Sequence, residues 1–336
     1  MVASDRTGAA SPTPPTPVFE AKDVVKRFPI RQGMLGFRQG SVHALNGVSF
    51  ALAPGETLGV VGESGCGKTT LGKVAMRLLP VDEGRVFLLG QDITALPEAE
   101  LRPLRRNVQM VFQDPFSSFN PRMRCGGIVA EPLRINGLAR RSAEGEQIAA
   151  MFERVGLRPE HMRRYPHQLS GGQRQRLSIA RALALAPSVI VADEPVSALD
   201  VSVQAQVLNL LMDLQREGQF AYLFIAHDLA VVEHIAHRVA VMYLGRIVEI
   251  AEKRALYARP LHPYTEALLA AVPVPRPGGK RERRILRGEV ASPVNLPPGC
   301  AFHSRCPIAE AVCRETIPPL RRVGPDHWLA CHLRGG

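Results

Sequence analysis

An eight-residue glycine-rich stretch is the strongest chemical signal in the chain. Residues 62–69 read Gly-Glu-Ser-Gly-Cys-Gly-Lys-Thr, which fits the pattern G-x-x-x-x-G-K-[ST]. Glycines let the backbone curl so that successive N–H groups point at phosphate oxygens, and a helix beginning at Lys68 adds the positive end of its dipole. The Lys68 ammonium can reach β- and γ-phosphates, and the Thr69 hydroxyl can bind Mg²⁺. The stretch therefore predicts a site for nucleotide phosphates.

The sequence on both sides of this loop agrees with that interpretation. An apolar run over residues 56–61 predicts a strand before the loop, and helical periodicity over residues 68–79 predicts a helix after it. A chance glycine-rich turn would lack this context. Cys66 fills a variable position, and we interpret it as a small residue rather than a ligand. The residues expected around the phosphates are Gly62, Glu63, Ser64, Gly65, Cys66, Gly67, Lys68, Thr69 and Thr70.

Two adjacent acidic residues end a second apolar run. Residues 188–192 predict a buried strand, which Asp193 and Glu194 follow directly. Such a strand delivers its carboxylates to the edge of a parallel sheet, where α/β folds bind ligands. We expect Asp193 to hold Mg²⁺, directly or through water, and Glu194 to polarise the attacking water as a general base. Two acids that merely cap a helix are the alternative, which the upstream phosphate loop disfavours.

Four further motifs follow in order, and with the phosphate loop they resemble the ABC-transporter ATPase family. They are MVFQDP with Gln113, which resembles the Q-loop; LSGGQ at residues 169–173, the signature; SALD at residues 197–200, which resembles the D-loop; and IAHD with His227, the switch histidine. LSGGQ alone could be a helix start capped by Ser170, but the ordered set is highly specific. No catalytic position is substituted, which disfavours a scaffold that does not hydrolyse ATP.

The resemblance implies that two cassettes meet head to tail, with ATP between the phosphate loop of one and the signature of the other. The catalytic residues that it implies are Glu194, His227, Gln113 and Lys68. His227 would contact the γ-phosphate, and Gln113 the metal and the water. Phe28, in VVKRFPI, matches the aromatic residue that stacks on adenine, although a core position is its alternative. The residues expected to face the partner's ATP are Ser170, Gly171, Gly172, Gln173 and Asp200.

Motifs outside the cassette narrow the resemblance to ATPases of oligopeptide and dipeptide importers. The segment RPLHPYTEALLAAVP at residues 259–273 and the tail PPGCAFHSRCP resemble motifs of that group. The insertion at residues 31–43 is similar to that of the second ATPase of such importers. The resemblance covers about residues 18–336 and implies that the chain powers peptide import. Nickel and glycoside importers belong to the same group and remain alternatives, and a non-transport ABC ATPase that acts on ribosomes or DNA is a more distant one.

Four cysteines in the tail form a candidate metal centre. Cys300, Cys306, Cys313 and Cys331 have the spacing C-x5-C-x6-C-x17-C, without the C-x2–4-C pairs that zinc fingers favour. Thiolates hold all four irons of iron–sulfur clusters. Members of the resembled group can carry a 4Fe–4S cluster in this tail, which is the interpretation that we favour. Structural zinc and unligated thiols are the alternatives. Because the tail has few large hydrophobic residues, we expect the centre to stabilise its fold.

Alternating apolar runs and helical periods predict an α/β fold with parallel strands at its core. The resemblance specifies an ABC-type P-loop NTPase fold, with a RecA-like core, an antiparallel β subdomain and a helical subdomain, plus a small cysteine-rich C-terminal extension. The periodicity also predicts strands over residues 188–193 and 221–226, a helix over residues 203–217, and a hairpin over residues 238–250 that turns at Leu244-Gly245. The expected divisions are a disordered tail at 1–17, the cassette at 18–272 with its helical subdomain at about 114–172, and the extension at 273–336, which a Pro/Gly/Arg linker opens.

Charge and hydropathy bear on location and partners. The formal charge is +11, and 46% of the residues are hydrophobic, which excludes wholesale disorder. No run of 18 apolar residues and no secretory signal is present, so we expect a cytosolic location. The resemblance implies that the chain sits at the cytoplasmic face of the cell membrane. The resemblance implies ATP and Mg²⁺ as cofactors. The implied partners are a second ATPase subunit, two membrane permease subunits and an extracytoplasmic solute-binding protein, and we expect no nucleic acid.

Overall fold

The computed structural model describes residues 16–32, 37–139, 143–271 and 291–335. The expected disordered tail lies outside the described residues except at its last two positions. The expected linker at residues 273–284 also lies outside them, as does part of the insertion at 31–43.

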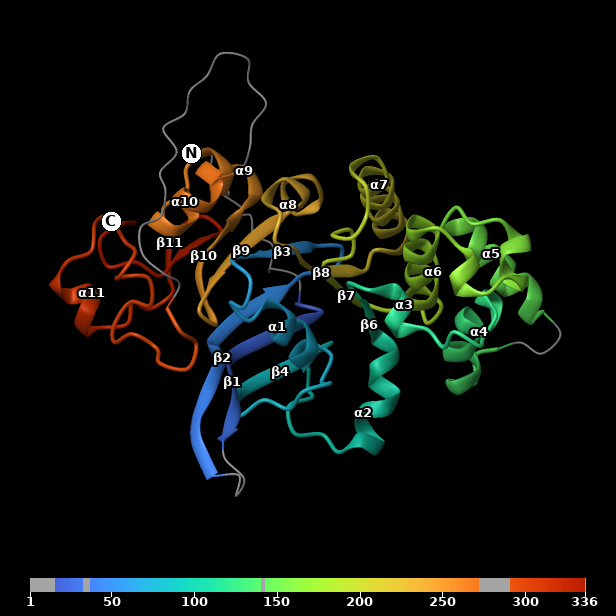
Figure 1. Ribbon diagram of the computed structural model, residues 1–336, viewed down its shortest axis with the longest axis horizontal. Coiled ribbons are helices and arrows are strands. Elements are labelled where there is room, and N and C mark those ends of the chain that lie inside the picture. The colour runs from blue at the N-terminus through green and yellow to red at the C-terminus, as the bar shows by residue number, and fades with distance from the viewer. Residues whose placement is uncertain (1–15, 33–36, 140–142, 272–290, 336) are drawn as a thin grey trace, which may run out of the picture.

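A sheet of eight strands, in the order β11-β12-β10-β9-β3-β8-β7-β6, forms the centre of the molecule (Figure 1). Its five parallel strands are β6 (Val108–Val111), β7 (Val189–Asp193), β8 (Ala221–Ile225), β3 (Thr57–Val61) and β9 (Arg238–Tyr243). Every residue of β3, β7 and β8 is buried, as expected of parallel strands covered on both faces. The predicted strands at residues 56–61, 188–193 and 221–226 are confirmed to within one residue at each end.

Helices cover one face of this sheet, and a second sheet covers much of the other. The helices α6 (Gly171–Leu183), α7 (Val201–Gly218) and α8 (Leu229–Ile235) share one hydrophobic core with alternate strand residues such as Ile190 and Phe224. The intervening residues, such as Val191 and Ile225, pack against α1 (Lys68–Ala75), α2 (Glu98–Leu104) and the second sheet. The predicted helix at residues 203–217 corresponds to α7.

The second sheet is antiparallel, in the order β2-β1-β4-β5. Its strands are β1 (Phe19–Gln32), β2 (Phe37–Leu52), β4 (Glu83–Leu88) and β5 (Gln91–Asp92). A short 3-10 turn, η1 (Arg105–Asn107), then leads into β6. The expected antiparallel β subdomain is therefore present, and it brings β2 alongside α1 and the loop that precedes it.

Helix α1 is shorter than the sequence predicts. It ends at Ala75 rather than near residue 79, because Arg77 adopts a left-handed conformation with a φ of 51°. The Arg77 guanidinium donates hydrogen bonds to the carbonyl oxygens of Ile93 and Leu96, at 2.8 and 3.3 Å. These long-range bonds stabilise a turn that local periodicity cannot reveal.

The helical subdomain and the C-terminal extension lie at opposite ends of the long axis (Figure 1). Within the expected helical subdomain the elements are α3 (Pro115–Ser118), α4 (Cys125–Ile135), α5 (Glu144–Arg154), η2 (Pro159–Arg163) and η3 (Pro166–Gln168). At the other end the elements are α9 (Lys253–Ala258), α10 (Pro263–Ala271), α11 (Ala311–Glu315), β11 (Arg321–Gly324) and β12 (His327–Leu329).

The extension is built into the cassette. β9 and β10 (Arg246–Glu252) form the predicted hairpin, whose turn residues Leu244 and Gly245 have φ values of 45° and 73°. β12 then pairs antiparallel with β10, and Phe302, 1% exposed, belongs to the main hydrophobic core. Although the tail has few large hydrophobic residues, as the sequence shows, Phe302 joins it to the hydrophobic core of the cassette. Within the described ranges, no helix is long and apolar enough to span a bilayer.

Candidate active site

A cavity of about 590 Å³ opens where four parallel strands end at their carboxyl side. β3 leads into the glycine-rich loop, β6 precedes Gln113, β7 ends at Asp193 and β8 precedes His227. This edge is the usual ligand-binding edge of parallel sheets. The cavity is lined by Phe28, Val42, Ala44, Ser64, Gly65, Gly67, Lys68, Thr69, Thr70, Gln113, Glu194, His227 and Pro293. The structure thus brings most of the expected ATP-site residues to one place.

Two glycines of the loop are required by close backbone contacts. Gly62 has a φ of 156°, and a Cβ there would lie 2.2 Å from the carbonyl oxygen of Met242. Gly67 has a φ of 108°, and a Cβ there would lie 2.2 Å from the carbonyl oxygen of Ala44. Any side chain at either position would collide with backbone, so these glycines fix how the loop sits between β2 and β9.

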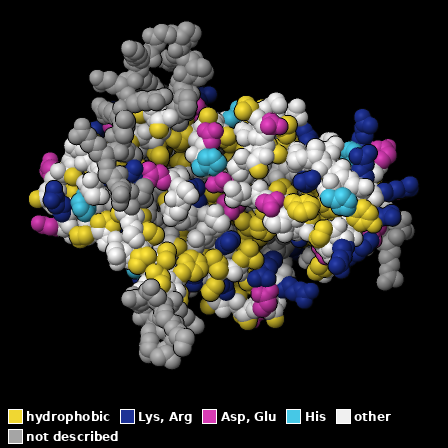
Figure 2. Space-filling model, viewed as in Figure 1, with side chains coloured by type: hydrophobic (Ala, Val, Ile, Leu, Met, Phe, Trp, Pro, Cys, Tyr) yellow, Lys and Arg dark blue, Asp and Glu magenta, His cyan; other side chains and the backbone are white. Residues whose placement is uncertain are grey.

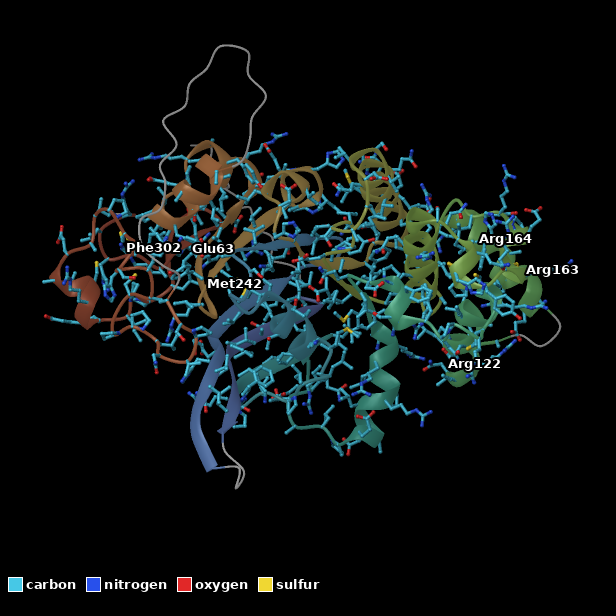
Figure 3. The ribbon with its side chains drawn as sticks, viewed as in Figure 1. Glu63, Arg122, Arg163, Arg164, Met242 and Phe302 are labelled. Atoms are coloured by element: carbon cyan, nitrogen blue, oxygen red, sulfur yellow. The ribbon has the colours of Figure 1, made fainter. Side chains whose placement is uncertain are left out.

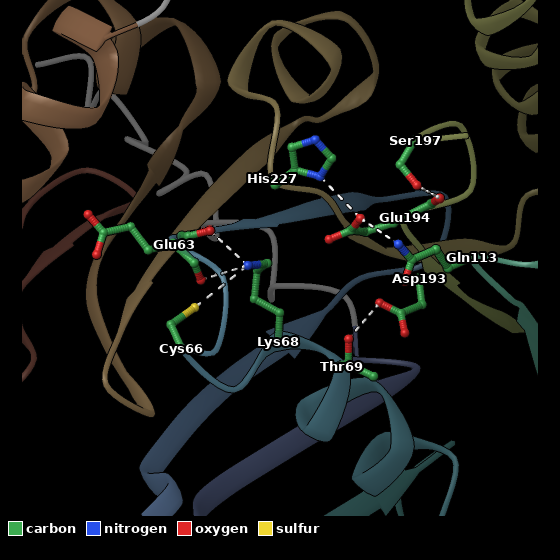
Figure 4. Close-up of polar contacts among 10 residues, drawn as sticks. Glu63, Cys66, Lys68, Thr69, Gln113, Asp193, Glu194, Ser197 and His227 are labelled. Atoms are coloured by element: carbon green, nitrogen blue, oxygen red, sulfur yellow. Dashed lines mark hydrogen bonds and ion pairs between the residues drawn. The ribbon is translucent and has the colours of Figure 1, made fainter. Parts of the chain in front are cut away.

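The Lys68 ammonium lies inside the curve of the loop. It donates hydrogen bonds to the carbonyl oxygens of Gly62 at 2.7 Å and Glu63 at 3.0 Å (Figure 4). Lys68 also lies 3.8 Å from the Cys66 sulfur. Burial raises the pKa of Cys66, so this thiol stays neutral at physiological pH, as a small packing residue should. The positive charge of Lys68 therefore has no thiolate to offset it within the loop.

Thr69 and Asp193 form a pair of oxygen donors beside the loop. The Thr69 hydroxyl donates to Oδ1 of Asp193 at 3.2 Å (Figure 4). Burial raises the pKa of the Asp193 carboxyl, and the neighbouring Glu194 charge adds to the increase, while the bond from Thr69 opposes it. Mg²⁺ is commonly bound by one or two protein oxygens together with phosphate oxygens. A hydroxyl and a buried carboxylate next to a phosphate loop fit that requirement.

Glu194 is the meeting point of the Q-loop and the switch histidine. Its Oε2 accepts a hydrogen bond from Nε2 of Gln113 at 3.1 Å and lies 3.1 Å from Nδ1 of His227 (Figure 4). Glu194 has a φ of 45°, a backbone conformation that is strained for any residue other than glycine. Its backbone N–H donates a hydrogen bond to the carbonyl oxygen of Ile225, and its carbonyl oxygen accepts one from the Ser197 hydroxyl. These bonds hold the strained conformation and aim the carboxylate into the cavity.

Phe28 and Pro293 lie at the part of the cavity formed by β1 and β2. Phe28, from β1, is half-buried, and the Lys26 ammonium lies 5.7 Å from its ring centroid. Its ring lines the cavity, so it is not a core residue. Pro293 comes from the C-terminal extension, and its carbonyl oxygen accepts a hydrogen bond from the His43 N–H at 2.8 Å. Pro293 is not predictable as a cavity residue from the sequence, because nothing local links residue 293 to this cavity.

The signature lies apart from the phosphate loop of the same chain. A separate cavity of about 280 Å³ is lined by Ser170, Gly171, Gly172, Gln173, Arg176, Ala198, Leu199, Asp200, Val203 and Gln206. Ser170 caps α6, since its hydroxyl accepts from the Gln173 N–H at 3.3 Å and its N–H donates to Oε1 of Gln173 at 3.0 Å. The structure thus brings the signature and D-loop residues together, but into a different cavity from the remaining expected ATP-site residues.

The four tail cysteines gather in one region without forming a metal site. The pKa of Cys300 is raised to about 11, mainly by burial and also by the neighbouring Cys313, Cys306 and Cys331. Yet no three or more His, Cys, Asp or Glu side chains in the described part of the chain are grouped so that they could hold a metal ion. The expected iron–sulfur or zinc centre is therefore not supported by this geometry.

Two residues that the sequence analysis did not single out contact the phosphate loop. The Tyr264 hydroxyl accepts a hydrogen bond from the Glu63 N–H at 2.9 Å, and Arg305 forms an ion pair with the Glu63 carboxylate. Both lie inside the tail motifs, HPYTEAL and HSRC, that carry the resemblance to importer ATPases. Those motifs were the available signal, although the sequence alone does not say what they contact.

A strand–loop–helix phosphate site that faces a carboxylate at the end of another parallel strand of the same sheet defines a P-loop nucleotide hydrolase. Family models match residues 45–197 as "ABC transporter" and residues 248–313 as "Oligopeptide/dipeptide transporter, C-terminal region". The chain is 54% identical to the oligopeptide transport ATP-binding protein AppF of Bacillus subtilis (strain 168), over 94% of this chain and 97% of that protein. It is 55% identical to the probable peptide ABC transporter ATP-binding protein y4tS of Sinorhizobium fredii (strain NBRC 101917 / NGR234), over 94% of this chain and 90% of that protein.

A solved structure agrees with these sequence relationships. The ATP-binding cassette MJ0796, a dimer in a post-hydrolysis state bound to ADP and Pi, superposes with a TM-score of 0.63 at 28% identity, covering 70% of this chain and 99% of that one. The chain belongs to the ATP-binding subunits of ABC transporters, in the branch that carries the oligopeptide/dipeptide C-terminal region. The predicted family and the predicted ATPase activity are thereby confirmed.

Proposed function

We propose that this chain hydrolyses ATP to power the import of dipeptides and oligopeptides through separate permease subunits at the cytoplasmic face of the membrane. The observation that carries the proposal is the convergence of Gln113 and His227 on the Glu194 carboxylate, across a cavity from the phosphate loop. The peptide specificity rests on the relatives, whose names describe peptide transport, and on the matched C-terminal region.

Each residue has a distinct role in the proposed reaction. Glu194 accepts a proton from the attacking water, and the hydrogen bond from Gln113 orients its carboxylate. Loop N–H groups and Lys68 bind the β- and γ-phosphates, and His227 contacts the γ-phosphate. Thr69 and Asp193 would hold Mg²⁺, which offsets the phosphate charge when it is bound. Phe28 stacks on the adenine at the other side of the cavity.

The signature cavity would serve the nucleotide of a second cassette. Ser170 and the amides of Gly171 and Gly172 lie in a cavity separate from the chain's own phosphate loop, which supports a head-to-tail pair. The similar MJ0796 cassette is itself described as a dimer. We assign Gln173 and Asp200 to the same contact. The second cassette would be a different ATPase subunit, which makes the pair a heterodimer.

The helical subdomain supplies the surface proposed for the permease subunits. The N-terminus of α4 and the end of η2 are joined by a hydrogen bond from the Cys125 N–H to the Arg164 carbonyl oxygen at 2.8 Å. The exposed side chains of Arg122, Arg163 and Arg164 lie around this junction (Figure 3), and the exposed Arg124 directly precedes Cys125. Figure 2 shows Lys and Arg side chains gathered at this end of the molecule. Clustered exposed guanidinium groups suit a partner that offers carboxylates or carbonyl oxygens.

Affinity purification of the tagged chain from native membranes tests the proposal directly. Two permeases, a second ATPase and a peptide-binding protein should be recovered together, and the reconstituted complex should take up labelled peptide only with ATP. Uptake of nickel or a glycoside, with no uptake of peptide, would favour the alternative solute. Recovery of nucleic acid, with an affinity that falls steeply with salt, would favour a non-transport ATPase.

A 4Fe–4S cluster held by Cys300, Cys306, Cys313 and Cys331 is a separate proposal with a structural role. Its support is their spacing and their proximity in the extension. Because no metal-binding group is preformed within the described ranges, the four thiols would have to move together on binding. Anaerobically purified protein should contain iron and acid-labile sulfide and absorb near ~400 nm. Stoichiometric zinc without iron would support the zinc alternative. Protein that contains neither iron nor zinc would show that the four thiols are unligated.

A further inference from the structure

The side chain of Glu63, in the phosphate loop, is held by the C-terminal extension. The two terminal nitrogens of Arg305 donate to the two carboxylate oxygens of Glu63, at 2.9 and 3.0 Å, although 242 residues separate the pair. The Arg305 side chain is 7% exposed and the Glu63 side chain 24%. The hydrogen bonds to Glu63 raise the pKa of Arg305, so its charge is permanent. A two-pronged pair of this kind fixes orientation as well as distance.

The backbone of Glu63 is restrained on both sides. Its N–H donates to the Tyr264 hydroxyl at 2.9 Å, which turns this N–H away from the cavity. Its carbonyl oxygen accepts from the Lys68 ammonium at 3.0 Å. The extension, α10 and the loop's own lysine therefore hold one residue at its side chain, its N–H and its carbonyl oxygen. This residue directly precedes the loop residues that line the cavity.

Aromatic packing makes the support for Arg305 rigid. The rings of Tyr243, Tyr264 and Phe302 contact one another with centroid distances of 4.7, 5.3 and 5.3 Å. The Arg305 guanidinium carbon lies 5.9 Å from the Tyr243 centroid, and the Arg305 N–H donates to the Phe302 carbonyl oxygen at 3.0 Å. Arg305 thus bonds both to the backbone of Phe302 and to the carboxylate of Glu63, two residues that are labelled in Figure 3. Movement of the extension would therefore move Arg305.

We propose that Arg305 is a positioning residue for ATP, through which the extension sets the affinity of the cassette for nucleotide. The ion pair holds Glu63 so that the following N–H groups face the phosphates before ATP arrives, which reduces the ordering cost of binding. Arg305 does not touch the nucleotide. The extension also contributes Pro293 to the cavity wall, so it contacts the site at two places. The inference rests on the proposed binding of ATP by this loop.

The test compares Arg305→Gln with Arg314→Gln in the full-length chain. Arg314 is an exposed arginine of α11 in the same extension, so it controls for loss of a positive charge. Titration with MgATP should show a dissociation constant about tenfold higher for Arg305→Gln, as expected when one charge-assisted contact no longer orders the loop. Arg314→Gln should match the wild type. In the assembled transporter, the KM for ATP should rise in Arg305→Gln while kcat changes less than about twofold, a split that general destabilisation does not produce.

Further variants connect the effect to the ion pair. Glu63→Gln should weaken ATP binding as much as Arg305→Gln. The double variant should bind ATP with about the affinity of the single variants, since both changes break the same ion pair. Arg305→Lys, which keeps the charge but loses the fork, should lie between wild type and Arg305→Gln. If Arg305→Gln does not fold, Glu63→Gln and Arg305→Lys carry the test.

Three results would overturn the inference: unchanged affinity in Arg305→Gln, unchanged affinity in Glu63→Gln, or full additivity in the double variant. A wild-type chain that does not bind ATP would instead overturn the proposed function.

Discussion

Oε2 of Glu194 lies 3.1 Å from Nδ1 of His227 and 3.1 Å from Nε2 of Gln113, so one carboxylate oxygen joins the ends of three neighbouring strands. Glu194 follows β7, Gln113 follows β6 and His227 follows β8. This arrangement links any displacement of the Q-loop, which leads into the helical subdomain, to the orientation of the proposed general base. Nucleotide state and permease contact can be coupled through it.

Replacing Glu194 by Gln should separate binding from hydrolysis. The amide keeps the size of the side chain but cannot accept a proton, so we expect MgATP affinity within about threefold of wild type. Turnover should fall by at least about 100-fold, the usual contribution of a general base. Steady-state phosphate release by the assembled transporter measures the loss. Near-normal hydrolysis would contradict the assigned role.

Replacing Asp193 by Asn should stabilise the fold and impair magnesium use. Because burial raises the pKa of this carboxyl, ionisation at neutral pH costs folding free energy, and the amide removes that cost. Without nucleotide, the thermal midpoint of Asp193→Asn should exceed that of wild type at pH 7. The difference should shrink as the pH falls through the raised pKa and vanish below the ordinary value of 3.8.

The same Asp193→Asn variant should need more Mg²⁺ for half-maximal hydrolysis, because a neutral amide is a poorer ligand for this ion. Scanning calorimetry from pH 3 to 8 and a magnesium titration provide the two measurements. An Asp193→Asn chain with a lower midpoint than wild type at pH 7 would refute the stability argument.

Truncating Phe302 tests whether the extension shares the core of the cassette. The side chain is 1% exposed and contacts two tyrosine rings, so Phe302→Ala should lower the free energy of unfolding by about 3–5 kcal/mol. Val312→Ala, at an exposed position of α11, should cost less than about 0.5 kcal/mol. Chemical denaturation monitored by far-UV circular dichroism compares them. Equal, small losses of unfolding free energy in the two variants would show that the extension does not share the core of the cassette.

Reversing charge on the helical subdomain tests the proposed permease surface. Arg122→Glu combined with Arg163→Glu places carboxylates where guanidinium groups are exposed, far from the cavity. ATP binding by the isolated chain should be unchanged, while co-purification of the permease subunits should fall by about tenfold or more, as like charges repel across the interface. Undiminished recovery of permeases would exclude this surface. Arg102→Glu combined with Arg106→Glu, at exposed positions outside that subdomain, is the matched control.

The sequence predicts most of the ATP site because its determinants are local. A loop of eight residues, a strand that ends in Asp193 and Glu194, and a capped helix at Ser170 each follow from short patterns. Parallel pairing then brings the ends of those strands together without further information. The hairpin turn at Leu244-Gly245 is equally predictable, because a glycine between two apolar runs is its local signature.

Features that depend on contacts between distant residues could not be predicted from the sequence. Helix α1 ends early because Arg77 bonds to carbonyl groups 16 and 19 residues away. The pairing of Arg305 with Glu63 spans 242 residues, and no periodicity reports it. The cysteine spacing suggested a metal centre that the side-chain geometry does not support within the described ranges, since spacing along the chain does not fix the distances between sulfur atoms.

The pairing of β12 with β10 also bears on the solubility of the chain. β10 carries a row of buried apolar residues. Without β12 it would be an exposed edge strand of the central sheet, with which strands of other molecules could pair. β12 pairs with that edge of β10, and β11, which pairs with β12, is the edge strand of the sheet. It is only four residues long, and its exposed Arg321 and Arg322 side chains oppose further pairing. Cassettes that lose the last strands of their extension should therefore aggregate edge to edge, even where their ATP site remains intact.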